Sequence, residues 1–145
     1  MSQNHPVIVE QTFMTSTDKL WAALTDVHRM RQWFFPNIPD FKPEKGFATQ
    51  FEVQSGHRDF LHQWKVTEVK PREKLILSWT YDGYQGQSRV TFEILPEGNQ
   101  VRLRLIHQGW ENFPQDIPEF RRESCLEGWQ YLIKKSLYQW LQENK

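Results

Sequence analysis

The segment from Asp116 to Lys145 constrains the fold most, because it is long and periodic enough to form a full-length amphipathic helix. At about 100° per residue, its apolar residues fall on one broad arc. The arc comprises Cys125, Leu126, Trp129, Leu132, Ile133, Ser136, Leu137 and Trp140. This pattern predicts a helix of about 26 residues, with Asp116 and Glu119 as an acidic capping box and Pro118 in the first turn. A helix with two tryptophans on one face must be covered, and a curved antiparallel sheet would cover it.

The composition indicates one soluble domain that spans residues 1–145. Eighteen basic and eighteen acidic side chains cancel, so no net charge attracts nucleic acid. A single cysteine, and the lack of an apolar run near the roughly 20 residues of a membrane span, predict a cytoplasmic protein without membrane insertion. Seven tryptophans and ten phenylalanines suit either an apolar cavity or a solid aromatic core.

The chain before this segment consists of shorter elements. Alternating apolar residues from Val7 to Phe13 predict a first strand, and Ser16 is placed to cap a short helix after it. A second short helix is predicted from about Val27 to Phe34. Three prolines then prevent regular structure, so we expect residues 35–45 to form a stiff connection at the rim of a pocket.

From residue 46 to residue 109 the apolar residues recur at every second position, which predicts five more strands. They are expected at about 46–54, 58–69, 74–82, 87–95 and 100–108. Short turns join them, so consecutive strands should pair antiparallel. The predicted fold is therefore α+β, in the order β-α-α-β-β-β-β-β-α. A curved antiparallel sheet wraps around the long C-terminal helix, with an apolar cavity between the two.

Several local strings resemble a known family in their order and spacing. They are Leu20 to Asp26, Gln32 to Pro36, Val66 to Pro71 with Leu75 to Trp79, His107 to Trp110, and Gly128 with Trp129. They are similar to the activator of heat-shock-protein ATPase homologue-like (AHSA-like) family, within the START/SRPBCC helix-grip superfamily. Ile106 departs from the pattern, because members often carry threonine there. The resemblance implies a helix-grip fold with a cavity, and it implies no reaction, since the superfamily includes carriers, cyclases and chaperone regulators.

No catalytic or metal-binding motif accompanies this pattern. The histidines lack metal-ligand spacing, and His57 and His62 should point to opposite faces of their strand, so we predict no metal and no cofactor. Cys125 has no partner motif and is interpreted as a small apolar filler. His62 and His107 lie on the concave face, where a buried neutral histidine with one hydrogen bond is the simpler interpretation. A cyclase- or hydrolase-type enzyme that uses His62 or His107 is an alternative.

The candidate ligand-binding residues are those that strand parity, helical periodicity and the resemblance direct toward the cavity. They are Trp33, Phe51, His62, Trp64, Trp79, Tyr81, Phe92, His107, Trp110, Arg122, Cys125 and Trp129. Arg122 falls inside the apolar arc, where its guanidinium suits a carboxylate, unless its stem lies along the aromatic surface and its head group reaches solvent. Gly128 is predicted to let the helix approach a neighbour closely.

Three functions follow as hypotheses. The first is a small-molecule binding protein for an apolar or amphipathic ligand, such as an aromatic or acyl acid whose acidic end faces Arg122. The second, implied by the resemblance, is a chaperone ATPase regulator with a chaperone as partner; it ranks lower because the dedicated activators carry an additional domain. The third is the histidine-dependent enzyme, for which a positioned acid-base group in the cavity is required.

Overall fold

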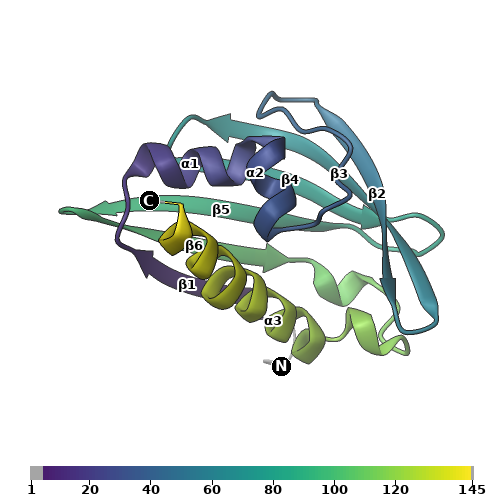
Figure 1. The fold of residues 1–145 in the computed structure, drawn as a ribbon. Coiled ribbons are helices and arrows are strands. Elements are labelled where there is room, and N and C mark those ends of the chain that lie inside the picture. Colours follow the sequence, from purple (N-terminus) through teal and green to yellow (C-terminus); the bar gives the residue numbers. More distant parts are fainter. Residues whose placement is uncertain (1–4, 145) are drawn as a thin grey trace.

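The computed structural model describes residues 5–144 and contains one six-stranded antiparallel sheet in the order β1-β6-β5-β4-β3-β2. The strands are β1 (Val7–Phe13), β2 (Ala48–Ser55), β3 (Arg58–Lys70), β4 (Lys74–Tyr81), β5 (Ser88–Glu97) and β6 (Gln100–Gln108). Helices α1 (Thr17–Thr25) and α2 (Val27–Trp33) lie between β1 and β2 in the chain. Figure 1 shows α1, α2 and the C-terminal helix on the same side of the curved sheet. The predicted α+β class and element order are confirmed.

The concave face of the sheet carries the core, as the alternation of apolar residues predicted. On β6, Val101, Leu103, Leu105 and His107 are buried, and the residues between them are partly exposed. The other face is polar: Arg104 forms ion pairs with Glu10 on β1 and Glu93 on β5. Because a shift of one residue would exchange the two faces, this alternation fixes the register of the strands.

The C-terminal helix runs from Arg122 to Glu143. It comprises α3 (Arg122–Gln130), a π-helical segment η4 (Tyr131–Leu137) and α4 (Tyr138–Glu143). Its buried side chains are Trp129, Ile133, Leu137 and Leu141. The predicted apolar arc is therefore confirmed at its centre. Within residues 5–144, no helix combines the length and the apolar character that a membrane crossing needs.

The predicted start of this helix at Asp116 is wrong by six residues. Residues 110–120 form two 3-10 turns, η2 (Trp110–Asn112) and η3 (Pro118–Phe120), and Arg121 is extended, with φ −77° and ψ 156°. Phe113 and Phe120 are buried with Phe60 in a second aromatic cluster. Burial of these two rings against β3 outweighs the helical tendency of the segment, so Asp116 and Glu119 do not cap the helix. Lys145, the last residue of the segment, lies outside the described residues.

Candidate functional site

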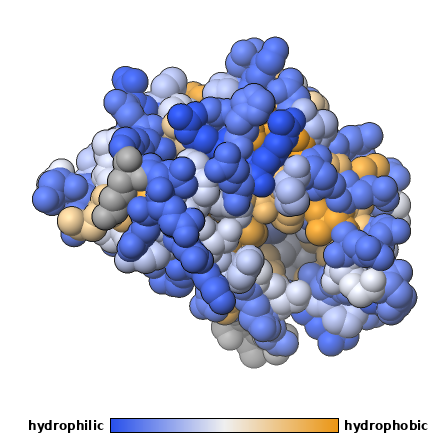
Figure 2. All heavy atoms as spheres, viewed as in Figure 1, coloured by the Kyte–Doolittle hydropathy of each residue, from blue (hydrophilic) through white to orange (hydrophobic). Residues whose placement is uncertain are grey.

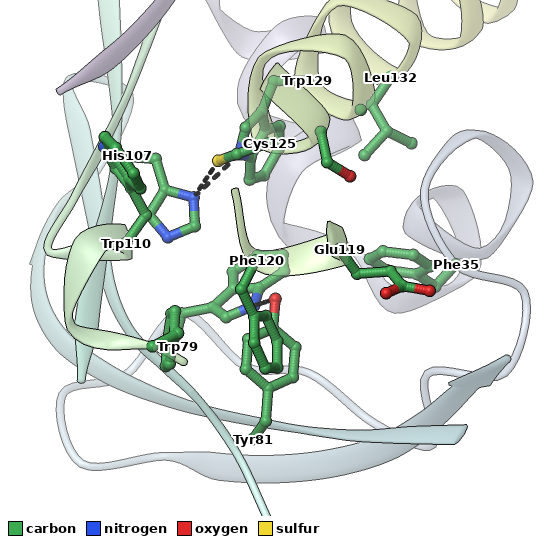
Figure 3. A pocket seen from close by; sticks show the side chains of 13 residues that line it. Phe35, Trp79, Tyr81, His107, Trp110, Glu119, Phe120, Cys125, Trp129 and Leu132 are labelled. Carbon is green, nitrogen blue, oxygen red and sulfur yellow. Dashed lines mark hydrogen bonds between the residues drawn. The ribbon is translucent and has the colours of Figure 1, made fainter. Parts of the chain in front are cut away.

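A pocket of about 150 Å³ opens between the start of the C-terminal helix, the ends of β4 and β6, and the segment 110–120. The lining residues are Phe35, Trp79, Tyr81, His107, Trp110, Phe113, Glu119, Phe120, Ser124, Cys125, Gly128, Trp129 and Leu132. Ser124 and Gly128 are exposed, so the pocket reaches the surface beside the helix. Figure 2 shows a hollow with hydrophobic residues on this side of the molecule, surrounded by hydrophilic ones. Figure 3 shows the aromatic rings of the lining around it.

Half of the predicted ligand-binding residues line this pocket. They are Trp79, Tyr81, His107, Trp110, Cys125 and Trp129. Trp33, Phe51, His62, Trp64 and Phe92 are buried in the core and do not line this pocket. In this part of the core the ring of Phe34 packs against both Trp64 and Trp129, with centroid distances of 5.2 Å and 5.8 Å. A ligand-binding role stays a prediction for both groups.

Arg122 does not line the pocket. Its Nε donates to the carbonyl oxygen of His5 at 3.3 Å, and its Nη2 donates to that of Pro6 at 3.1 Å. The guanidinium therefore ties the first turn of the helix to the chain just before β1. The predicted contact between Arg122 and a ligand carboxylate stays a prediction, and these hydrogen bonds would compete with it.

His107 on β6 is held by hydrogen bonds at both ring nitrogens. The indole Nε1 of Trp129 donates to Nδ1 at 3.1 Å. An indole N–H can only donate, so Nδ1 must be the acceptor and Nε2 must carry the proton. Nε2 then donates to Ser88 Oγ at 2.9 Å, and that hydroxyl donates to the carbonyl oxygen of Trp79 at 2.7 Å. These bonds fix one neutral tautomer, and burial lowers the pKa of His107 from 6.5 to about 3.

Cys125 lies beside the same imidazole, with Sγ 3.2 Å from Nδ1 of His107 (Figure 3). A cysteine–histidine pair of this kind is a nucleophile only when the thiol gives its proton to the ring. Here burial raises the pKa of the Cys125 thiol to about 12, and it keeps His107 neutral. Nδ1 also accepts from Trp129. The pair is therefore a neutral hydrogen-bonded contact and not a thiolate–imidazolium pair.

His62 on β3 is neutral as well. Its Nδ1 lies 3.1 Å from the carbonyl oxygen of Phe60, which can only accept, so Nδ1 carries the proton. Burial lowers the pKa of His62 from 6.5 to about 4. At neutral pH neither His62 nor His107 holds the second proton that a general acid would donate.

Tyr81 is the polar residue at the base of the pocket. Its hydroxyl oxygen accepts a hydrogen bond from Nε1 of Trp79 at 2.9 Å. The ring contacts Phe113 and Phe120, with centroid distances of 5.0 Å and 4.9 Å. Burial raises the pKa of the Tyr81 phenol, so the hydroxyl keeps its proton.

The rim is closed on one side by a polar clasp between η3 and the β2–β3 hairpin. Glu119 accepts from Ser55 Oγ at 3.1 Å and pairs with Arg58 Nη1 at 3.2 Å. The pKa of Glu119 is lowered, first by a hydrogen bond from its own backbone N–H and then by Ser55 and Arg58. The amide of Gln115 donates to the carbonyl oxygens of Trp110, Phe113 and Phe120, which holds the segment 110–120 in shape.

Comparison with known proteins decides the family. Residues 14–142 match the family described as Activator of Hsp90 ATPase homolog 1-like protein. The chain belongs to this family. No curated protein matches the chain.

Solved structures share the fold of this AHSA1-like domain. Protein MLL2253 from Mesorhizobium loti is 27% identical, with a TM-score of 0.76 and coverage of 97% of this chain and 99% of that chain. The Aha1 dimer from Colwellia psychrerythraea is 19% identical, with a TM-score of 0.71 and coverage of 92% of each chain. Protein Ms6760 from Mycobacterium smegmatis is 10% identical, with a TM-score of 0.76 and coverage of 98% and 94%.

The pocket of this AHSA1-like domain also contains residues that the sequence analysis did not select as ligand-binding. They are Phe35, Phe113, Glu119, Phe120, Ser124, Gly128 and Leu132. Phe35 begins the proline-rich connection that was expected at the rim. Residues 116–120 were expected inside the C-terminal helix, so nothing directed Glu119 and Phe120 toward a pocket.

Gly128 corrects another expectation. A Cβ atom at this position would have no neighbour within 4 Å, so the glycine does not serve a close helix contact. It lies inside α3, where glycine is less favourable than alanine by about 1 kcal/mol. Its missing side chain leaves space beside the pocket. Within residues 5–144, no group of three or more histidine, cysteine, aspartate or glutamate side chains is arranged to hold a metal ion.

Proposed function

We propose that this AHSA1-like domain binds a small, largely apolar molecule of about the size of one aromatic ring in the pocket beside Trp129. The observation that carries the proposal is the pocket itself, which has a volume of about 150 Å³ and walls made mainly of aromatic rings. An apolar cavity of about that volume accommodates benzene. The volume is below the roughly 300 Å³ at which drug-sized sites begin, which favours a small ligand.

The hydrogen bonds around the pocket support a preformed site. Trp129 donates to His107, and Trp79 donates to Tyr81, so both indole rings are held in one orientation. A wall that is already ordered loses little side-chain entropy when a ligand enters. Gly128 supports the same proposal, because a glycine that no turn and no close contact requires keeps the entrance open.

The decisive experiment fills the pocket from Gly128. Ethylbenzene is titrated into the wild type, Gly128→Ala and Gly128→Leu, and binding is followed by NMR chemical shifts. Since a Cβ atom at position 128 would have no neighbour within 4 Å, both variants should fold, and replacing a helical glycine should stabilise α3. Gln130→Leu, at an exposed position on the same helix, is the matched control.

We expect ethylbenzene to bind the wild type, Gly128→Ala and Gln130→Leu, and to lose at least tenfold in affinity for Gly128→Leu. Equal affinity for Gly128→Leu and the wild type would mean that the probe binds elsewhere. Native mass spectrometry of protein purified from its own host then identifies the retained molecule.

The contact with a chaperone stays a prediction that rests on the family description. Stimulation of a chaperone ATPase tests it directly. If Gly128→Leu still stimulates the chaperone ATPase, the surface that contacts the chaperone is distinct from the pocket.

A further inference from the structure

Polar atoms at the pocket wall are few, and most of them already have partners. His107 uses both ring nitrogens, and the carboxylate of Glu119 accepts from Ser55 and Arg58. Ser124 is exposed, so its hydroxyl can bond to water as well as to a ligand. The hydroxyl of Tyr81 differs from these groups.

The Tyr81 oxygen accepts from the Trp79 indole, and this leaves its proton to be donated. Among residues 5–144, no side chain or carbonyl group accepts that proton within hydrogen-bond distance. Figure 3 shows the hydroxyl directed from β4 toward the indole of Trp79 at the base of the pocket. Phe113, Phe120 and Trp79 hold the phenol, so the donor is oriented before a ligand arrives.

The charges at the pocket restrict what the donor can meet. None of the thirteen lining residues in the described chain is a lysine or an arginine, and Glu119 is the acidic one. A ligand carboxylate would therefore lose its hydration, meet no cation in the wall and lie near a like charge. A neutral oxygen avoids all three penalties.

We infer that Tyr81 selects the ligand by donating a hydrogen bond to a neutral acceptor, such as a carbonyl oxygen, carried on an apolar ring-sized body. This inference rests on the proposed function and adds the chemical class of the ligand. It differs from the acid expected from the sequence, because Arg122 donates to the carbonyl groups of His5 and Pro6 and does not line the pocket.

The test compares three probes of similar size: ethylbenzene, acetophenone and benzoate. Dissociation constants are measured by NMR titration for the wild type, Tyr81→Phe and Ser124→Ala, which removes the other pocket hydroxyl. Tyr81→Phe leaves the Trp79 N–H without its acceptor, and that N–H could replace the lost donor. The double variant Trp79→Phe/Tyr81→Phe therefore removes both donors, and ethylbenzene binding reports whether each pocket remains intact.

We expect the wild type and Ser124→Ala to bind acetophenone about tenfold more tightly than ethylbenzene, and benzoate most weakly. This preference should disappear in the double variant. The role of Tyr81 would be overturned if the double variant kept the preference or if Ser124→Ala alone lost it. It would also be overturned if the wild type bound both neutral probes equally or bound benzoate most tightly. Binding of ethylbenzene would still support the proposed function in these cases. If no probe binds the wild type, the proposed function fails, and the inference fails with it.

Discussion

Acidification should destabilise this domain through its buried histidines, and His107 allows the effect to be isolated. In the folded protein burial lowers the pKa of His107 to about 3, whereas its ordinary value is 6.5. Below about pH 6.5, His107 therefore binds a proton in the unfolded chain but stays neutral in the folded chain. The free energy of unfolding must fall as the pH falls from about 6.5 toward 3.

The magnitude follows from the same two values. Each pH unit below 6.5 contributes about 1.36 kcal/mol, so at about pH 4.5 His107 should have lowered the stability by about 2.7 kcal/mol. His62, with a pKa of about 4, adds a loss of similar size over the same range. Together these losses are comparable with the total stability of a small domain, about 5–15 kcal/mol.

Urea unfolding of the wild type and His107→Gln between pH 7 and pH 4.5 measures the contribution of His107. Glutamine can accept from Trp129 and donate to Ser88, as the neutral imidazole does, and it does not titrate. The difference in stability between pH 7 and pH 4.5 should be about 2.7 kcal/mol smaller in this variant. His28→Gln, at an exposed site, should follow the wild type. Parallel curves for the wild type and His107→Gln would refute the buried neutral state of His107.

Three further changes test the rest of the structure. Trp129→Ala removes a buried ring that contacts Phe34, Trp79 and Phe92, so urea unfolding should show a loss of about 3–5 kcal/mol, and a near-neutral result would contradict the packing of α3. Glu119→Gln removes the charge of a partly exposed clasp, so it should change the global stability little but speed hydrogen exchange in residues 110–120 relative to the strands. An unchanged exchange rate would argue against the clasp. Because burial raises the pKa of the partly exposed Cys125 thiol to about 12, iodoacetamide should modify it much more slowly in the folded than in the urea-unfolded protein, as mass spectrometry would measure, and similar rates would contradict the raised pKa.

The sheet was predictable from the sequence because it depends on local patterns, namely the alternation of apolar residues within each strand and the short turns between strands. A period of two directs Trp64, Trp79 and Leu103 to one face, and the structure buries all three. The short turns allow only antiparallel neighbours. The last strand pairs with β1, and each β1 residue from Val7 to Phe13 has its partner on β6.

The start of the C-terminal helix was not predictable in this way. Asp116, Pro118 and Glu119 form a credible helix start by composition alone. The competing interaction is the burial of Phe120 against Phe60, which lies sixty residues earlier in the chain. A helical wheel considers only residues along one helix, so it cannot show a contact with a distant strand. It also assumes a constant number of residues per turn, whereas this helix widens to a π-helix at Tyr131–Leu137.

The same long-range contacts that displace the helix start also shape the candidate site. If α3 began at Asp116, Phe120 would lie inside the helix and would not be free to turn toward Phe60 and Tyr81, so this part of the pocket wall would be lost. With the start at Arg122, that segment folds over the ends of β3 and β4 and leaves space in front of Gly128. The strands present Trp79, Tyr81 and His107, which parity predicts, whereas the opposite wall depends on packing that only the folded chain provides. A pocket built in this way should vary most among AHSA1-like domains in the segment before the last helix, because a change there alters the ligand space without disturbing the sheet.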